Sequence, residues 1–503
     1  MLTNWGLTLA IFLPLLGAAL IALTPRSREG AIKFFSLVFT GLPLLIGLAL
    51  LGPYRTGVSG MQFEVTAPWI PSIGAEYHIG VDGISLPLLL LTFLITFLCM
   101  IYSRWHMPEP HNPKAFLSLV LVLETGMAGT FVALDLVLFF IFWELVLVPM
   151  YFLIGLWGGP RRQYAAIKFF LYTLFGSVFM LLGFLALYFR SDPHTFNMLA
   201  LARTGGDLVF GVQRIIFVAL FLGFAIKVPM FPFHTWLPDA HTEAPTVGSV
   251  LLAAVLLKMG TYGFVRISLP ILPDAAVAFA PWIGLLAVIA ILYGALNCLA
   301  QVDLKRMIAF SSVGHMGFVM LGIATLTDTG INAAVYGMVS HGVITGMLFF
   351  IAGSIHERYH TRDIPELGGL MLKLPILAGL LTYSAIASLG LPGLAGFWGE
   401  VFALLASYSP LPGLPASTFR IFMVLGGVGT VLTAGYFLWM LQRVNLGGIP
   451  ERWKNKKFPD VQPMELAAWA PLLVLILVLG VYPALVLDVT NHAVVGLVRA
   501  LAG

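Results

Sequence analysis

Long apolar runs alternate with short polar connections along the whole chain. The runs lie near residues 5–23, 32–51, 81–102, 113–133, 136–157, 165–189, 211–231, 247–268, 277–299, 304–325, 331–355, 374–408, 419–441 and 465–487. A membrane-spanning helix needs about 20 such residues, and backbone polar groups in lipid are satisfied only in helices or closed barrels. The pattern predicts an all-α polytopic membrane protein with about 14 transmembrane helices.

Two of these predicted helices are interrupted by proline. Leu391-Pro392-Gly393 divides the run 374–408, which is too long for one straight helix, and Lys227-Val228-Pro229 lies in the run 211–231. Proline lacks a backbone donor and breaks a helix, and broken backbone at membrane depth is tolerated where protein buries it or where it lines a water cavity. A cation such as Lys227 costs roughly 2.5–3.5 kcal/mol there unless it has a partner or water. Lys227 is therefore a candidate element of an ion pathway.

The spacing of the breaks predicts an internal repeat. We expect four parts: three N-terminal helices in 1–112, a first five-helix repeat in 113–270, a second, inverted five-helix repeat in 271–441, and a cytoplasmic loop with a C-terminal helix in 442–503. The fourth span of each repeat carries a proline break, and five spans force the second repeat to be inverted. Inverted repeats with matching broken helices indicate a transport site.

Composition supports a membrane protein and adds its orientation. Of the 503 residues, 59% are hydrophobic and 10% charged, against about 25% charged in soluble domains. Among the 27 Lys and Arg residues, eighteen flank one side of the predicted spans and seven the other. Because basic loops stay cytoplasmic, we expect an inner-membrane protein with both termini on the periplasmic side. The net charge of +4 reflects this sidedness and gives no nucleic-acid signal.

Seven ionisable residues lie well inside the predicted spans. They are Glu124, Glu144, Lys227, Lys258, His315, His341 and Glu400. A single one could be a polar group that holds helices together. Seven, spread over both halves, indicate a proton relay.

Glu144 and Lys227 belong to one predicted repeat, so each is the obvious partner of the other. The pair could open and close during transport, or it could be a permanent structural ion pair. Lys258 could take protons on from Lys227, since Gly260 and Gly263 beside it permit close helix approach, or it could snorkel to the surface.

The two histidines are expected to connect Lys258 with Glu400. Histidine exchanges protons near neutral pH, so His315 and His341 could bridge the two predicted repeats, with Glu400 ending the series. The plainer alternative is that each is a hydrogen-bonded polar residue.

The connection 233–246 concentrates polar residues on the predicted cytoplasmic side. It holds His234, Asp239, His241 and Glu243, which suggests a hydrated proton entry or a structural loop. A metal site is not favoured, because the spacing matches no recognised ligand pattern. The chain contains no P-loop, dinucleotide fingerprint, CxxC pair or haem motif, so we expect no cofactor in this chain.

Four stretches carry a family resemblance over nearly the whole chain. They are FWELVLVPMYFLIGLWGG at 142–159, KVPMFPFHTWLPDAHTEAPTVGSVLLAAVLLKMGTYG at 227–263, KRMIAFSSVGHMGFVMLG at 305–322 and LGLPGLAGFWGE at 389–400. They resemble the antiporter-like membrane subunits of respiratory complex I, the NADH:quinone oxidoreductase. In its length and in having an acid at position 400, the chain most resembles the M-type branch of that family.

The resemblance implies a fold, an activity and a set of roles. It implies about fourteen helices with two inverted repeats, and proton translocation along a central polar axis driven from a distant quinone site. It assigns Glu144 and Lys227 to a Glu–Lys pair, Lys258 to a central lysine, His315 and His341 to connecting histidines, Glu400 to a terminal acid and Glu124 to an additional acid. NADH, FMN, iron–sulfur clusters and quinone would reside in partner subunits. The partners would be other membrane subunits of complex I, including neighbouring antiporter-like subunits, and the lipid bilayer.

The same motifs leave other functions open. Subunits of multisubunit Na⁺/H⁺ antiporters, of membrane-bound hydrogenases and of photosynthetic complex I share them. A structural scaffold, whose polar residues only hold helices together, is a third class of function.

Overall fold

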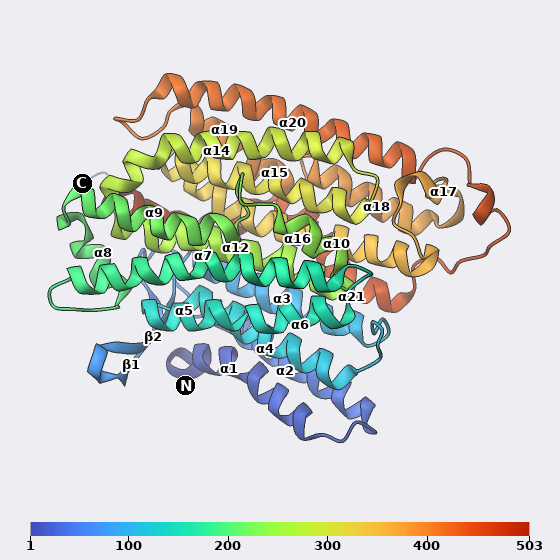
Figure 1. Ribbon diagram of the computed structural model, residues 1–503, viewed down its shortest axis with the longest axis horizontal. Coiled ribbons are helices and arrows are strands. Elements are labelled where there is room, and N and C mark those ends of the chain that lie inside the picture. Colours follow the sequence, from blue (N-terminus) through green and yellow to red (C-terminus); the bar gives the residue numbers. More distant parts are fainter. Residues whose placement is uncertain (1, 502–503) are drawn as a thin grey trace.

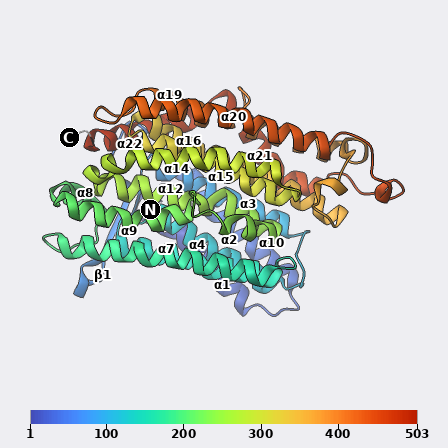
Figure 2. The same ribbon diagram turned by 45° about the horizontal axis from the view of Figure 1, so that its top comes forward.

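The computed structural model, which describes residues 2–501, is a bundle of helices that run side by side (Figures 1 and 2). Its long helices are α1 (Leu2–Leu23), α2 (Glu29–Leu50), α3 (Ser85–Ser103), α4 (Pro113–Val132), α7 (Arg162–Arg190), α14 (Pro273–Ala300), α15 (Leu304–Ala324), α16 (Asp328–Tyr359), α20 (Ala416–Val444), α21 (Pro463–Val481) and α22 (Ala484–Leu501). The interrupted helices are α5 (Leu136–Leu145) with α6 (Leu147–Trp157), α9 (Phe210–Lys227) with α10 (Trp236–Glu243), α11 (Thr246–Leu251) with α12 (Leu257–Gly263) and α13 (Leu269–Ile271), and α18 (Pro375–Ser388) with α19 (Gly396–Tyr408). Short helices α8 (Met198–Thr204) and α17 (Leu370–Lys373) lie in connections.

The predicted count of fourteen spans is confirmed. Fourteen helices in residues 2–501 are long and apolar enough to cross a membrane. One of these, α22, contacts the ends of other elements: Asn332 in the second turn of α16 bonds to Thr490 and Asn491, and Gly83 packs on Val489. It therefore lies across one end of the bundle. The broken pair α18–α19 provides the crossing predicted for 374–408, and the last predicted span ends at Val481 instead of 487.

The two ends of the bundle differ in chemistry. The basic end, at the right of Figure 1, carries the connections 158–161, 301–303, 360–374 and 445–462. The hairpin end, at the left, carries α8, the chain's last helical residues and a two-stranded sheet. That sheet pairs β1 (Gln62–Ile70) antiparallel to β2 (Ala75–Val81). The sequence predicted only helices, so this hairpin is an addition to the all-α class.

The first predicted break is present after Lys227. The helix α9 ends at Lys227, and α10 begins at Trp236. Pro229 cannot donate, and the Met230 N–H donates to Ala225 at 2.8 Å instead of to Ile226. The Trp236 indole donates to the freed Ile226 carbonyl at 2.8 Å, so the break is satisfied by protein. The segment expected as the connection 233–246 therefore contains the second half of a broken helix.

The second predicted break lies between α18 and α19. Gly390 and Gly393 have φ values of +83° and +91°, which glycine adopts at no steric cost. The far side of the break is anchored on α21, because the Ala395 N–H donates to Ile476 at 3.0 Å and the Trp398 indole to Gly480 at 2.8 Å. In each predicted repeat the break thus falls in the fourth crossing helix.

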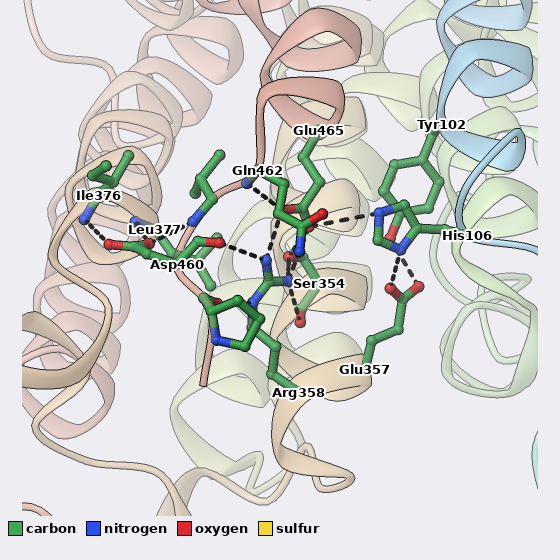
Figure 3. Close-up of polar contacts among 12 residues, drawn as sticks. Tyr102, His106, Ser354, Glu357, Arg358, Ile376, Leu377, Asp460, Gln462 and Glu465 are labelled. Atoms are coloured by element: carbon green, nitrogen blue, oxygen red, sulfur yellow. Dashed lines mark hydrogen bonds and ion pairs between the residues drawn. The ribbon is translucent and has the colours of Figure 1, made fainter. Parts of the chain in front are cut away.

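A buried ion pair ties the basic end together (Figure 3). Arg358 on α16 makes two bonds to Glu465 on α21, at 2.6 and 2.9 Å, and Glu465 has no exposed surface. Arg358 also donates to the Pro459 and Asp460 carbonyls. The Asp460 carboxylate in turn accepts from the Ile376 and Leu377 N–H groups at 3.0 and 3.1 Å. The connection 445–462 is therefore a strap that fixes the start of α18 to the end of α16.

Candidate functional site

Four ionisable side chains form a continuous line across the centre of the bundle. Lys258 Nζ lies 2.6 Å from His341 Nδ1, the rings of His341 and His315 are 5.5 Å apart, and His315 Nδ1 lies 3.0 Å from Glu400 Oε1. Lys258 comes from the first predicted repeat, and the other three come from the second. The structure thus brings together four residues that the sequence analysis singled out.

The conformation around Lys258 explains how a lysine is held there. Two π-helical segments, Leu252–Leu256 and Phe264–Ser268, flank α12. Such bulges disturb the i→i−4 ladder and are frequent at functional sites, and the Ala253 carbonyl in the first bulge accepts from Lys258 Nζ. Lys258 has no exposed surface, so it does not snorkel to the surface.

The glycines beside Lys258 allow the expected close approach. A Cβ at Gly260 would lie 2.8 Å from the Phe224 carbonyl oxygen, and one at Gly263 2.4 Å from the Phe224 ring. Since real Cβ atoms do not come this close, α12 can pack against α9 only with glycine at these positions.

A small cavity separates His341 from Glu400. It has a volume of about 30 Å³ and is lined by His315, His341, Thr345, Ser388 and Glu400, among others. His341 Nε2, Thr345 Oγ1 and Glu400 Oε2 have no hydrogen-bond partner among residues 2–501. A water needs about 10–15 Å³ and two to four polar partners, so this cavity has the size and the chemistry to hold water.

The break in the second half shapes the acid end of this line. His315 Nε2 pairs with Ser388 Oγ at 3.0 Å, and Ser388 is the last residue of α18. Glu400 lies in the second turn of α19 and is 6% exposed. His315 therefore contacts both halves of the broken helix, with one ring nitrogen on each.

Glu144 and Lys227 are neighbours without a direct contact. Lys227 Nζ and Glu144 Oε1 are both buried and have no hydrogen-bond partner in the part of the chain that is described. The ammonium lies 5.3 Å from the centre of the Trp143 ring, a cation–π distance. Pro149 leaves the Leu145 carbonyl without its helical donor, and α5 ends at that residue. The expected pair is therefore open in this structure, and an aromatic ring faces the lysine.

Glu124 lies on α4 away from any charged partner. It has no exposed surface, and both carboxylate oxygens lack a partner among the described residues. Nothing in the contacts joins it to the line from Lys258 to Glu400.

The predicted entry residues fall into two groups. Asp239 pairs with Lys168 at 2.7 Å and has Arg161 and Arg306 within 3.8 Å, while Glu243 accepts from the Arg161 N–H at 2.9 Å. His234 packs against Tyr293, and His241 stacks on Phe349 with 4.5 Å between rings. None of the four has more than 8% of its surface exposed, and within residues 2–501 no three such side chains are placed to hold a metal. The segment is thus packed protein, with its two acids in structural bonds.

Sequence reasoning missed several partners of the line. The role of the Ala253 carbonyl could not be predicted from sequence, because no residue type predicts a π-bulge. Ser388 and Thr345 look like ordinary helix-packing residues, although Ser388 directly precedes a predicted break. Lys305 is one of the eighteen basic residues that flank the predicted cytoplasmic side, yet it lies in the first turn of α15 and is 4% exposed.

Two protein-family models match most of this chain. Residues 133–433 match the family described as "NADH:quinone oxidoreductase/Mrp antiporter, TM", and residues 63–130 match "NADH-ubiquinone oxidoreductase chain 4, amino terminus". The chain therefore belongs to the family of antiporter-like membrane subunits of NADH:quinone oxidoreductase.

Individual relatives indicate which branch of the family this chain resembles most. The chain is 42% identical to NADH-quinone oxidoreductase subunit M of Rhodobacter capsulatus, over 98% of this chain and 96% of that protein. It superimposes on a chain of respiratory complex I from Thermus thermophilus with a TM-score of 0.87 and 30% identity, over the whole of both chains. It shares its fold with a chain of the Mrp complex from Dietzia sp., at a TM-score of 0.85 and 21% identity over both full chains. These similarities support the M-type branch expected from the length and from Glu400.

Proposed function

We propose that this chain translocates protons along the line Lys258–His341–His315–Glu400, coupled to electron transfer in other subunits of NADH:quinone oxidoreductase. One observation carries the proposal: these side chains lie within contact of one another and join the two halves of the bundle. Polar residues that only hold helices together would not need to form a continuous series of contacts.

The geometry supports a route for the proton. Lys258 Nζ donates to His341 Nδ1, so the proton of a neutral His341 resides on Nε2. That nitrogen and Glu400 Oε2 both lack a hydrogen-bond partner among the described residues, and both side chains line the cavity, so water there would carry the proton from the imidazole to the carboxylate. His315 holds Glu400 Oε1 and Ser388, which keeps the acceptor at the cavity.

The open Glu144–Lys227 pair would regulate the line. Closing the pair places a carboxylate beside the ammonium and stabilises its charge, while opening it leaves the charge on the Trp143 ring alone. Each predicted repeat, 113–270 and 271–441, thus contributes one part: the first a switchable lysine, the second a histidine–carboxylate acceptor.

In this function the chain would work in the inner membrane beside other subunits that carry the cofactors. NADH, FMN, iron–sulfur clusters and quinone are placed in partner subunits, and neighbouring antiporter-like subunits adjoin this one in the inner membrane. The basic end faces the cytoplasm, because Lys- and Arg-rich loops are retained there.

Proton pumping by the purified complex in vesicles tests the proposal. NADH oxidation should acidify the vesicle lumen in the unsubstituted complex, and Lys258→Ala should abolish this subunit's share while the complex still assembles. Cation-driven proton exchange by a preparation without redox subunits would support the antiporter alternative instead. Normal pumping in assembled Lys258→Ala would contradict the proposal.

A further inference from the structure

A cleft of about 570 Å³ opens at the basic end, between the α3–α4 connection and the last turns of α16. Its lining is rich in groups that bind and release protons, among them His106, Glu109, Lys305, His356 and His360. At the mouth, His106 bonds to Glu357 at 2.5 Å (Figure 3). The proposed relay does not use any of these residues.

Lys305 lies at the floor of the cleft. It belongs to the first turn of α15, lines the cleft and is 4% exposed. Its ammonium donates to the Ala244 carbonyl, directly after α10. A lysine in this position is reached by water from the cleft on one side and by α10 on the other.

His241 on α10 lies behind Lys305. It has no exposed surface, and neither ring nitrogen has a hydrogen-bond partner among residues 2–501. A buried polar side chain without a partner is uncommon. The helix α10 packs against α15, and Lys305 donates to the Ala244 carbonyl three residues beyond His241. On its other side, His241 stacks on Phe349 of α16, the helix that also carries His341.

One face of α16 connects the cleft to the relay. His341, Thr345, Phe349, Gly353 and His356 follow one another at intervals of three and four residues, which places them on one stripe of the helix. His341 and Thr345 line the relay cavity, whereas Gly353 and His356 line the cleft. At 1.5 Å per residue, the relay and the cleft lie about 18 Å apart along this stripe. Phe349, on which His241 stacks, is between them.

We infer that Lys305 and His241 form the proton input of this subunit, from the cleft to Lys258 and His341. Water in the cleft protonates the Lys305 amine; its ammonium passes one proton to the neutral His241 ring, which passes one to the relay and becomes neutral again. The Phe349 ring stacks on His241 between the cleft and the relay cavity. The inference rests on the proposed function, and it replaces Asp239 and Glu243, whose carboxylates are engaged, as entry groups.

Two substitutions test the input in the assembled complex. His241→Gln keeps a polar side chain but cannot carry a proton, and Lys305→Arg keeps the charge and the donor to Ala244 but cannot release its proton. We expect either to lower proton uptake by vesicles roughly 10-fold or more, on the scale of losing a proton-transferring side chain. His111→Gln, an exposed histidine at the same end but outside the cleft lining, is the matched control and should pump normally.

The outcomes separate this inference from the proposed function. Full pumping with Lys305→Arg would show that Lys305 is structural and would overturn the input. Normal pumping in His241→Gln together with loss in Lys258→Ala would overturn the input and leave the relay standing. Normal pumping in all three would contradict the relay itself.

A covalent block provides a second measurement that does not depend on tolerating a buried substitution. His356→Cys places a thiol at the exposed lining of the cleft, and the native Cys99 and Cys298 are buried. Labelling with a bulky, membrane-impermeant thiol reagent should lower pumping compared with the same preparation before labelling. Unchanged pumping after complete labelling would show that protons do not enter through this cleft.

Discussion

Lys258 is held by a backbone carbonyl and an imidazole, without a carboxylate. Among the described residues its ammonium contacts Ala253 and His341, and it lies in a span that is almost entirely buried. A buried charge without a counter-charge is costly. A structural lysine would be expected to have an acid beside it, so this environment favours a group that changes its protonation state.

Replacement of Lys258 by arginine tests whether that change is needed. Arginine keeps a donor for Ala253 and His341 but stays charged at all accessible pH values. We expect assembled Lys258→Arg to lose this subunit's share of pumping, as Lys258→Ala does. Restored pumping with arginine would show that Lys258 acts as a fixed charge.

Glu144 and Lys227 are a second set of buried ionisable residues, and among the described residues neither bonds to the line from Lys258 to Glu400. Trp143 precedes Glu144 and carries the ring beneath Lys227, and Trp143 is itself held by a bond from its indole to Ser177 at 3.0 Å. The ammonium of Lys227 therefore lies over a fixed ring next to Glu144 in the chain and has no direct bond to the carboxylate, an arrangement that suits a pair that opens and closes.

Glu144→Gln should lower pumping strongly while the complex still assembles. The amide preserves the shape of the side chain and removes the counter-charge that a closed pair gives to Lys227. NADH-driven proton uptake in vesicles is the measurement, with complex content as the control for assembly. Pumping at the level of the unsubstituted complex would reject the switchable pair in favour of a neutral packing role.

At the scale of helices, two of the breaks could be predicted and the bulges could not. Proline lacks a backbone donor, and Pro229 and Pro392 marked two of the interruptions from sequence. Pro14, Pro43, Pro281 and Pro471 nevertheless lie inside continuous helices, and the interruption between α5 and α6 was not predicted. The π-segments around Lys258, LAAVL and FVRIS, contain no proline or glycine that would mark them in the sequence. The hairpin 62–81 was missed because several polar residues and two prolines obscure its alternation. The ionisable residues were found because charge inside an apolar run is rare, but their order of contact required the fold.

The break between α18 and α19 depends on glycine at position 390. Alanine there would adopt a left-handed conformation, at a cost of about 1–2 kcal/mol, and its Cβ would lie 3.2 Å from Glu400 Oε2. We expect Gly390→Ala to lower both thermal stability and pumping. Gly379→Ala on α18, where a Cβ would meet nothing within 4 Å, is the matched control and should be neutral or stabilising. Equal behaviour of the two variants would show that the break does not position Glu400.

The strap 445–462 is held by the buried Arg358–Glu465 pair. Removing one member of such a pair costs about 3–5 kcal/mol, because the other charge remains buried and unpaired. Glu465→Gln should therefore loosen the strap, which limited trypsin digestion of the lysine-rich segment 452–457 would detect as faster cleavage. Glu451→Gln in the exposed pair with Lys454 should change little. Unchanged cleavage in Glu465→Gln would mean that other contacts hold the strap.

At the scale of the whole molecule, the line of side chains from Lys258 to Glu400 joins halves that the sequence presents as separate repeats. Lys258 on α12 and Glu400 on α19 are more than 140 residues apart in the chain, and two histidines and a small cavity connect them. Every proton that crosses would pass both residues. The two sites should therefore behave as one unit when they are substituted.

The last prediction follows from this connection. Lys258→Ala and Glu400→Ala should each impair pumping, and the double variant should be little worse than either single. Residues that act as a unit are strongly non-additive when removed, whereas distant, independent sites usually add. Lys258 and Glu400 do not touch, so non-additivity between them would have to be transmitted through His341 and the cavity at which His315 holds Glu400. Vesicle pumping and complex content would be measured for both singles and the double. Additive losses would assign the two residues to separate paths, one in each half of the bundle.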